Sequence, residues 1–217
     1  QCLYEGRWFD AAAAENIGIG LAGRTLGYVG FGNIGQDLYR LAQPFEMRHL
    51  VYDPYLNESA VGEFGIERVD FATLLDQADF IVLLCLLTDE TRHLIDDAAL
   101  KRMKKTAYLI NVARGAIIDQ AALARALAAD EIAGCGLDAY DPEPIAPDDP
   151  LLELDNANLT PHALGYTDEM IRLCSELCVA AALDVQRGTE PASVVNRAVL
   201  ERAGLQDKLD AYRRVYG

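Results

Sequence analysis

Short runs of apolar and β-branched residues alternate along the chain with longer amphipathic runs. The short runs predict buried strands, and the amphipathic runs, in which apolar positions recur every three or four residues, predict helices. Strands are expected at 25–30, 49–52, 80–84, 106–112, 132–137 and 158–160, and helices at 33–43, 71–78, 120–129 and 167–185. Because strands that alternate with helices are typical of βαβ units, the pattern predicts an α/β fold with a doubly wound, largely parallel sheet.

The predicted helices have polar residues at their starts and apolar stripes along their length. Asp70 and Asp119 can accept hydrogen bonds from the free N–H groups of a first helical turn, and Thr167 opens the longest helix. Two helices have one clear apolar face, formed by Ile34, Leu38 and Leu41 in the first and by Ile171, Cys174, Cys178 and Ala181 in the last. The Pro- and Asp-rich stretch 140–150 predicts a surface loop, and the polar tail from Val194 is expected to pack only loosely.

The balance of charges excludes one broad class of function. The chain has 217 residues, with 19 Lys and Arg against 34 Asp and Glu, and a formal net charge of −15. A basic footprint for nucleic acid needs the opposite balance, so no nucleic-acid partner is expected. Apolar residues make up 51% of the chain, which is enough for a packed core. No apolar run approaches the roughly 18 residues of a membrane-spanning helix.

The cysteines point to a reducing compartment. They are Cys2, Cys85, Cys135, Cys174 and Cys178, and they form no CxxC pair. An odd and scattered set favours reduced thiols that pack as small hydrophobic residues over a disulfide framework or a zinc site. No signal-peptide pattern follows Gln1, so we expect a cytoplasmic location, for a chain that is expected to lack its natural start.

A glycine pattern follows the first predicted strand and opens the first predicted helix. Residues 30–35 form a GxGxxG turn with Gly30, Gly32 and Gly35 at the glycine positions. The first glycine allows a tight turn, the second lets backbone N–H groups approach a pyrophosphate, and the third lets the helix pack closely on the strand. GxGxxG by itself is often only a glycine-rich turn, but the flanking strand and helix favour a Rossmann-like dinucleotide site.

An acidic residue stands where such a site needs one. Asp53 ends the second predicted strand, 18 residues after Gly35. A carboxylate there accepts hydrogen bonds from ribose hydroxyls and repels a 2′-phosphate, so Asp53 favours NAD over NADP. The alternative, in which Asp53 and Pro54 merely start a turn, is the weaker interpretation beside the glycine pattern.

Three polar side chains follow other predicted strands, at the edge where open α/β sheets bind ligands. Arg114 comes just after a strand and can fork onto a carboxylate, although a lone arginine is more often a surface residue. Glu143 lies in an Asp-Pro-Glu-Pro stretch, whose alternative interpretation is a solvated acidic loop. His162 follows the last short strand and shares this edge with the other two, whereas His49 and His93 are interpreted as structural.

Four segments together resemble the D-isomer-specific 2-hydroxyacid dehydrogenase family. They are 25–35, 111–119, 136–144 and 160–162, and the resemblance extends from about Trp8 to about Asn196. It implies an NAD-binding domain over residues 1–165, with an interdomain helix at its start. Residues 166–217 would then return through the C-terminal helix to a substrate domain that is otherwise absent from the chain.

The resemblance also implies roles for individual residues. The residue matching Arg114 binds the substrate's carboxylate and carbonyl, the one matching His162 is the general acid/base, and the one matching Glu143 holds and tunes that histidine. Reduction of a 2-keto acid needs a proton at the carbonyl oxygen, and a histidine is suited to supply it near neutral pH. The residues expected to bind NAD are Gly30, Gly32, Asn33, Ile34, Gly35, Asp53, Thr88, Val112, Ala113, Asp138, His162 and Gly165, and no metal site is predicted.

The chain departs from the family pattern in two respects. Leu86 stands where the family usually has proline, in the loop near the nicotinamide. In the family, most of the substrate domain precedes the matching region and supplies backbone contacts to the substrate carboxylate. This stretch by itself is therefore expected to bind NADH but to reduce 2-keto acids poorly. Its last helix is expected to expose the stripe of Ile171, Cys174 and Cys178.

Two classes of function remain open. The first is an NAD-dependent oxidoreductase that interconverts a small 2-hydroxy acid and its 2-keto acid, as a cytoplasmic homodimer without nucleic-acid or membrane partners. The second is a non-enzymatic NAD(H)-responsive protein like the C-terminal-binding-protein corepressors, or an inactive truncated paralogue. Arg114, Glu143 and His162 do not separate these classes, and the sequence does not name the 2-hydroxy acid.

Overall fold

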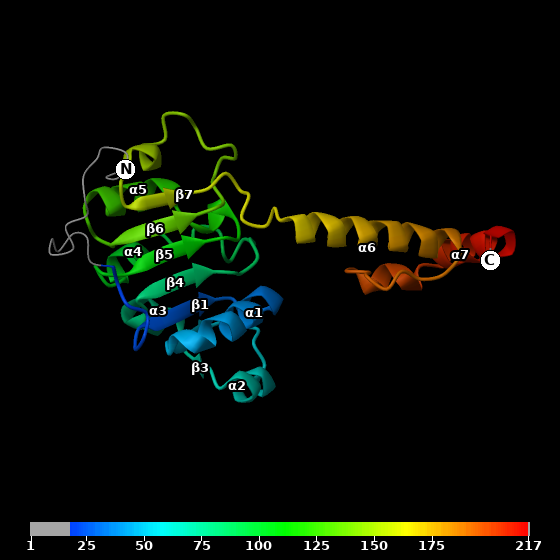
Figure 1. The fold of residues 1–217 in the computed structure, drawn as a ribbon, viewed down its shortest axis with the longest axis horizontal. Coiled ribbons are helices and arrows are strands. Elements are labelled where there is room, and N and C mark those ends of the chain that lie inside the picture. The colour runs from blue at the N-terminus through cyan, green and yellow to red at the C-terminus, as the bar shows by residue number, and fades with distance from the viewer. Residues whose placement is uncertain (1–17, 217) are drawn as a thin grey trace. The chain divides into compact units, whose positions relative to one another are not determined.

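The computed structural model describes residues 18–216 and places seven strands of that range in one sheet (Figure 1). They are β1 (Thr25–Val29), β2 (Arg48–Tyr52), β3 (Glu67–Arg68), β4 (Phe80–Leu83), β5 (Tyr108–Asn111), β6 (Gly134–Leu137) and β7 (Ala157–Leu159). The order is β3-β2-β1-β4-β5-β6-β7, and every neighbouring pair is parallel. The winding reverses between β1 and β4, so the predicted doubly wound, Rossmann-like sheet is confirmed.

Helices connect the strands, and the chain divides into two compact units. The first unit reaches His162 and contains the sheet with α1 (Asn33–Ala42), α2 (Glu58–Phe64), α3 (Phe71–Gln77), α4 (Asp97–Arg102) and α5 (Gln120–Ala128). Short 3₁₀ turns lie at Gln43–Phe45, Gly115–Ile117 and Pro150–Glu153. The second unit begins at Ala163 and contains α6 (Asp168–Gln186), a 3₁₀ turn at Arg197–Glu201 and α7 (Ala203–Tyr216).

The two faces of the sheet belong to two different apolar clusters. Tyr28, Val51 and Val82 pack in one cluster with residues of α1 and α2. The adjacent positions Val29 and Ile81 pack in the other cluster with residues of α3, α4 and α5. Because neighbouring residues of a strand point to opposite faces, this alternation shows that the central strands are buried on both sides by helices. In such sheets ligands bind outside the carboxyl ends of the strands.

Polar caps start the helices as the sequence predicted. Asp70 and Asp119 accept hydrogen bonds from N–H groups in the first turns of α3 and α5, and the Thr167 hydroxyl accepts one from the first turn of α6. The expected apolar face of α1 is only partly buried: Leu38 packs against the core, but the other two residues do not. Ile34 and Leu41 are 68% and 73% exposed, because Tyr39 turns inward and packs edge-on against the Phe31 ring.

The sequence patterns missed three short elements of the first unit: α2, β3 and α4. β3 consists of Glu67 and Arg68, both exposed, at the edge of the sheet beside β2. α4 is six residues long and is capped by Asp96. Such elements span less than about two helical turns or a few strand residues, so a periodic pattern has no room to develop.

The prediction of a loosely packed tail is only partly right: most described residues after Val194 are exposed, but α7 packs within the second unit. α7 buries Leu209, which is 1% exposed, and the Arg213 guanidinium donates a hydrogen bond to the Gly188 carbonyl at 2.6 Å. A Cβ atom on Gly188 would lie 2.3 Å from the Leu209 carbonyl oxygen, and Gly188 has a φ of +72°. A glycine just past α6 therefore allows the close approach by which α7 packs within the second unit.

Two of the cysteines pack as small hydrophobic residues, and two lie on the stripe of the last helix that is expected to be exposed. Cys135 is buried and Cys85 is partly buried, but Cys174 and Cys178 are exposed on α6, as is Ile171 of the same stripe. Cys2 and the predicted interdomain helix lie outside the described residues. Within residues 18–216, no helix combines the length and the apolar character needed to cross a bilayer.

Candidate active site

The glycine turn after β1 packs against the end of β4. Gly30 has a φ of +92°, and a Cβ atom there would lie 2.8 Å from the Cys85 backbone nitrogen. A Cβ on Gly35 would lie 3.1 Å from the Gly30 carbonyl oxygen, whereas nothing in the described residues lies within 4 Å of one on Gly32. The first and third glycines are therefore needed for close packing, and the second leaves the backbone at the start of α1 open.

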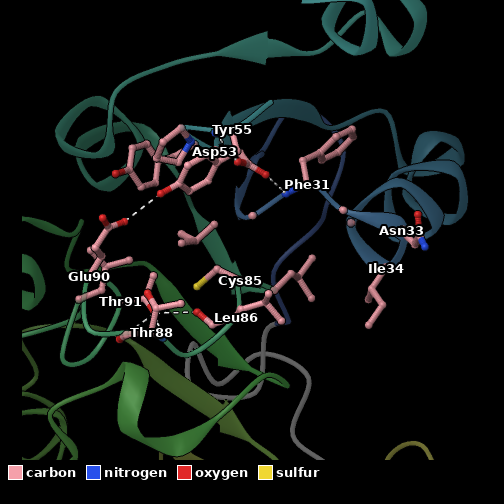
Figure 2. A pocket seen from close by; sticks show the side chains of 18 of the residues that line it. Phe31, Asn33, Ile34, Asp53, Tyr55, Cys85, Leu86, Thr88, Glu90 and Thr91 are labelled. Carbon is pink, nitrogen blue, oxygen red and sulfur yellow. Dashed lines mark hydrogen bonds between the residues drawn. The ribbon is translucent and has the colours of Figure 1, made fainter. Parts of the chain in front are cut away.

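Asp53 binds the same turn from the end of β2. Its Oδ2 atom accepts a hydrogen bond from the Phe31 backbone N–H at 2.9 Å, and its Oδ1 atom accepts one from the Tyr55 N–H, also at 2.9 Å. Figure 2 shows the carboxylate directed toward the Phe31 backbone. Two backbone donors thus fix the position of this negative charge beside the glycine turn.

A cavity of about 890 Å³ opens at this point, where the winding of the sheet reverses (Figure 2). Residues after β1, β2 and β4 line it. Those among them that the sequence predicted to bind NAD are Gly30, Gly32, Asn33, Ile34, Gly35, Asp53 and Thr88. The cavity therefore collects the predicted phosphate-binding turn, the predicted ribose-binding acid and the loop after β4.

Sequence reasoning missed further residues that line this cavity, among them Tyr55, Cys85, Glu90 and Thr91. The Tyr55 hydroxyl donates to Glu90 Oε2 at 3.0 Å, and this hydrogen bond, with the Glu90 charge, raises the pKa of Tyr55. Thr91 Oγ1 accepts from the Thr88 N–H at 2.8 Å. Tyr55 stands two residues after Asp53 and Glu90 two after Thr88, so proximity to predicted residues was the available signal.

The residues present fit a dinucleotide. α1 is ten residues long and begins within the glycine motif, directly after Gly32, so its first N–H groups and its dipole would face an anion bound at Gly32. The carboxylate oxygens of Asp53 offer acceptors for ribose hydroxyls, and the cavity volume of about 890 Å³ suits a large ligand. The open space beside Gly32 is where a pyrophosphate could approach the backbone.

The segment after β5 places Arg114 at the next part of the same sheet edge. Asn111, buried at the end of β5, accepts from the Ala113 N–H at 3.0 Å and donates to the Arg114 carbonyl at 2.9 Å. These two hydrogen bonds of the buried Asn111 amide fix the backbone conformation of residues 111–114. The Arg114 guanidinium donates to the Ala113 carbonyl at 2.7 Å and belongs to an exposed residue. Its remaining donors can therefore take a ligand.

Glu143 and His162 form a hydrogen-bonded pair. Glu143 Oε2 lies 2.9 Å from His162 Nδ1, and Glu143 Oε1 accepts from the Tyr140 N–H at 2.9 Å. The Tyr140 hydrogen bond, the hydrogen bond and charge of His162, and the charge of Arg114 lower the pKa of Glu143, against a smaller opposing effect of burial. Glu143 is therefore ionised at neutral pH, and its carboxylate lies against the Nδ1 side of the His162 ring.

A smaller cavity of about 200 Å³ brings two of these residues together. Arg114 and Glu143 both line it, together with Leu87, Arg92, Gly115, Ala116, Tyr140 and Asp141. His162 does not line this cavity but is hydrogen-bonded to Glu143, which does. The three residues predicted to be catalytic are thus brought together by the segments that follow β5, β6 and β7.

The other predicted NAD-binding residues are not among those that line the large cavity. Val112 and Ala113 follow β5, and Asp138 follows β6, where it is buried and accepts from the Thr160 hydroxyl at 2.6 Å. Gly165 belongs to the second unit. Their roles toward the cofactor stay predictions.

A parallel sheet with a glycine turn, an acid at the end of β2 and a cavity at the reversal of winding defines a dinucleotide-binding α/β domain. Residues 1–163 match the family model of the D-isomer specific 2-hydroxyacid dehydrogenase, NAD binding domain. The chain belongs to this family, and its cofactor is NAD.

Individual relatives agree with the family. The glyoxylate reductase of Korarchaeum cryptofilum is 42% identical over 198 residues, which are 91% of this chain and 60% of that protein. The NAD-complexed D-isomer specific 2-hydroxyacid dehydrogenase of Lactobacillus delbrueckii ssp. bulgaricus is 33% identical with a TM-score of 0.77, over 84% of this chain and 59% of that one. A glyoxylate reductase from Paecilomyes thermophila is 31% identical with a TM-score of 0.80, over 91% and 58%. The chain spans about three fifths of the length of each of these three relatives.

Proposed function

We propose that the protein is an NAD-dependent oxidoreductase that interconverts a small 2-hydroxy acid and its 2-keto acid. The observation that carries this proposal is the Glu143–His162 pair at 2.9 Å, beside Arg114 and on the sheet edge that holds the dinucleotide cavity. A histidine oriented by a carboxylate is a proton donor and acceptor, and an arginine fork binds a carboxylate. The names of the relatives, glyoxylate reductase and 2-hydroxyacid dehydrogenase, support the same reaction.

The protein would bind the pyrophosphate of the cofactor and also the groups on both sides of it, the adenosine ribose and the nicotinamide. The N–H groups at the start of α1 would bind the phosphates, and Asp53 would accept from the adenosine ribose. The resemblance assigns Asp138 to the nicotinamide carboxamide. When bound, the nicotinamide supplies the hydride that a carbonyl carbon accepts.

The chain's own residues would supply the proton and the orientation. Arg114 would fork onto the substrate carboxylate and fix the keto group relative to the cofactor. The ring nitrogen of His162 that faces away from Glu143, Nε2, would give its proton to the carbonyl oxygen in reduction and take it back in oxidation. Glu143, held by Tyr140, would stabilise the imidazolium before that transfer.

We also propose that the second unit belongs to the substrate domain and that the protein is a homodimer. α6 exposes a run of large apolar side chains: Ile171, Leu173, Leu177, Val179 and Leu183. Apolar surface of this extent usually has a partner. Sedimentation of the whole protein tests the assembly, and the cytoplasmic location stays a prediction from the scattered cysteines.

A panel of 2-keto acids tests the activity. The whole protein should oxidise NADH with at least one of glyoxylate, pyruvate and hydroxypyruvate. NADH binding without turnover of any 2-keto acid would favour the non-enzymatic NAD(H)-binding alternative. Residues 1–217 by themselves are expected to bind NADH and to reduce slowly, since the resemblance assigns part of the substrate contacts to a segment outside them.

A further inference from the structure

Four hydrogen bonds form a closed ring around the Glu143–His162 pair. The Tyr140 N–H donates to Glu143 Oε1 at 2.9 Å, and Glu143 Oε2 lies 2.9 Å from His162 Nδ1. The backbone N–H of His162 donates to the Thr160 carbonyl at 2.9 Å, and the Tyr140 hydroxyl donates to that same carbonyl at 2.7 Å. The ring thus starts and ends at Tyr140, whose backbone N–H binds Glu143 and whose hydroxyl binds the Thr160 carbonyl.

Tyr140 is the buried member of this ring. It is 8% exposed and belongs to the large apolar cluster, whereas the side chains of Glu143 and His162 are 37% and 46% exposed. The Tyr140 hydroxyl also lies 3.0 Å from the Leu137 carbonyl, at the end of β6. Burial raises the pKa of Tyr140, so the hydroxyl stays protonated and keeps its role as a donor at neutral pH.

The Tyr140 hydroxyl acts on a strained part of the backbone. His162 has a φ of +51°, a left-handed conformation that costs free energy in a residue with a side chain. The Thr160 carbonyl, held by the Tyr140 hydroxyl, accepts the His162 N–H and so helps to hold this conformation. The direction of the imidazole ring depends on it.

We propose that Tyr140 is a positioning residue that fixes the Glu143–His162 pair through its buried hydroxyl. This rests on the proposed function of the pair as a proton donor and acceptor. Two exposed side chains would otherwise sample many rotamers, and a rigid neighbour reduces the entropy cost of holding them in line. The hydroxyl holds the backbone that carries His162, and the Tyr140 N–H holds the carboxylate that orients its ring.

Tyr140→Phe in the whole protein removes the hydroxyl and keeps the ring and its packing. The matched control is Tyr108→Phe, which removes a hydroxyl at the start of β5, at the opposite end of the strands, where Tyr108 stacks on Phe80. Thermal unfolding of both variants fixes an assay temperature at which both are folded.

In Tyr140→Phe, kcat for 2-keto acid reduction should fall about two- to tenfold, which corresponds to one lost hydrogen bond. KM for the 2-keto acid and the NADH affinity should change little, because Arg114 and the large cavity are not in the ring. The alkaline limit of the kcat profile should move to lower pH, because a His162 ring that is held less firmly against Glu143 is stabilised less as the imidazolium. A kcat and an alkaline limit equal to those of Tyr108→Phe would overturn the proposal, since a merely structural role lowers stability without moving the pH profile.

A spectroscopic readout separates this proposal from the proposed function. The His162 Nδ1 proton, held by Glu143, should give a downfield, slowly exchanging NMR resonance in the wild type and in Tyr108→Phe. In Tyr140→Phe this resonance should shift and exchange faster with solvent. An unchanged resonance would overturn the positioning role even if the enzyme reduces 2-keto acids. A changed resonance in a protein that reduces none would support the positioning role and contradict only the proposed function.

Discussion

A Cβ atom on Gly115 would lie 1.9 Å from the carbonyl carbon of Tyr140. The backbone after Arg114 and the backbone after β6 therefore pack directly on each other, with no space for a side chain between them. Gly115 is also fixed by its own carbonyl, which accepts from the Ile118 N–H at 2.9 Å. Since neither backbone can move cheaply, this contact sets the distance between the substrate-binding arginine and the Glu143 segment in the proposed site.

Gly115→Ala should damage both stability and substrate binding. Overpacking a rigid contact costs about 1–3 kcal/mol, occasionally more, and the displaced turn should raise KM for the 2-keto acid more than it weakens NADH binding. The matched control is Gly136→Ala in β6, where a Cβ would lie 3.9 Å from its nearest neighbour, an ordinary contact. Urea unfolding and steady-state kinetics measure both effects, and equal stability of the two variants would contradict the packing argument.

Asp53 should make the protein prefer NADH over NADPH. Its carboxylate is fixed beside the glycine turn by the Phe31 and Tyr55 N–H groups, so a 2′-phosphate would meet a negative charge that cannot turn away. Asp53→Asn keeps an oxygen acceptor but removes the charge. NADH should then bind about tenfold more weakly, and the ratio of the NADPH and NADH dissociation constants should fall.

Nicotinamide fluorescence titrations measure these constants for both cofactors. Asp97→Asn, an exposed acid of α4 paired with Lys101, is the control and should bind like the wild type. A wild type that binds NADPH as tightly as NADH would show that Asp53 does not discriminate between a ribose 2′-hydroxyl and a 2′-phosphate.

His162→Ala should slow 2-keto acid reduction in the whole protein by roughly 10²–10⁴-fold, the usual loss when a general acid is removed. NADH affinity should change much less than kcat, because the large cavity is lined by other residues. The control is His93→Asn, since His93 is exposed and has a φ of +52°, which asparagine tolerates. Turnover of His162→Ala at the wild-type rate would show that His162 does not transfer the proton.

Local patterns were enough to predict the glycine turn, Asp53 and most strands, because each depends on residues that are neighbours in sequence. The buried face of α1 could be predicted only in part in this way. Ile34 and Leu41 have helical spacing, but the pairing of Tyr39 with Phe31 decides which side turns inward. The close approach at Gly188 that packs α7 is likewise a tertiary contact.

The site shows the same division. Arg114, Glu143 and His162 could be picked out because each follows a strand. Tyr140 was missed because its contact with the Thr160 carbonyl joins residues 20 apart in the sequence, and no periodicity reports such a pair. Tyr55 and Glu90 meet across 35 residues in the same way.

Asp79 should matter for stability at the opposite end of the sheet. Burial alone would raise its pKa, but hydrogen bonds from Lys104 and the Thr25 N–H, with the charges of Lys104 and Arg24, lower it overall. Asp79→Ala leaves the buried Thr25 N–H without its acceptor and should cost about 1–3 kcal/mol. The control is Asp37→Ala, which changes an exposed side chain of α1 and should change stability little.

The pH dependence of the Asp79 contribution follows from the sign of that shift. Because the pKa is lower in the folded than in the unfolded protein, the stabilisation is complete above the unfolded pKa and is lost as the pH falls through about 4 and below. Urea unfolding at neutral and acidic pH should show the wild type and Asp79→Ala converging in acid. A constant difference between them at every pH would contradict this.

Glu143→Gln should move both pH limits of the reaction in the same direction. The Tyr140 N–H, His162 and Arg114 hold the pKa of Glu143 below its usual value, so the carboxylate is charged throughout the working range and favours the imidazolium. Glutamine removes that charge. Reduction, which needs the imidazolium, should then fail at a lower pH, and oxidation, which needs the neutral ring, should begin at a lower pH.

A substitution that merely distorted the site would scale both rates without moving either limit. Asp148→Asn makes the same chemical change in the same acidic loop and should leave both limits in place. Steady-state rates in both directions across the pH range measure the shift, and limits that stay fixed in Glu143→Gln would mean that the carboxylate does not tune His162.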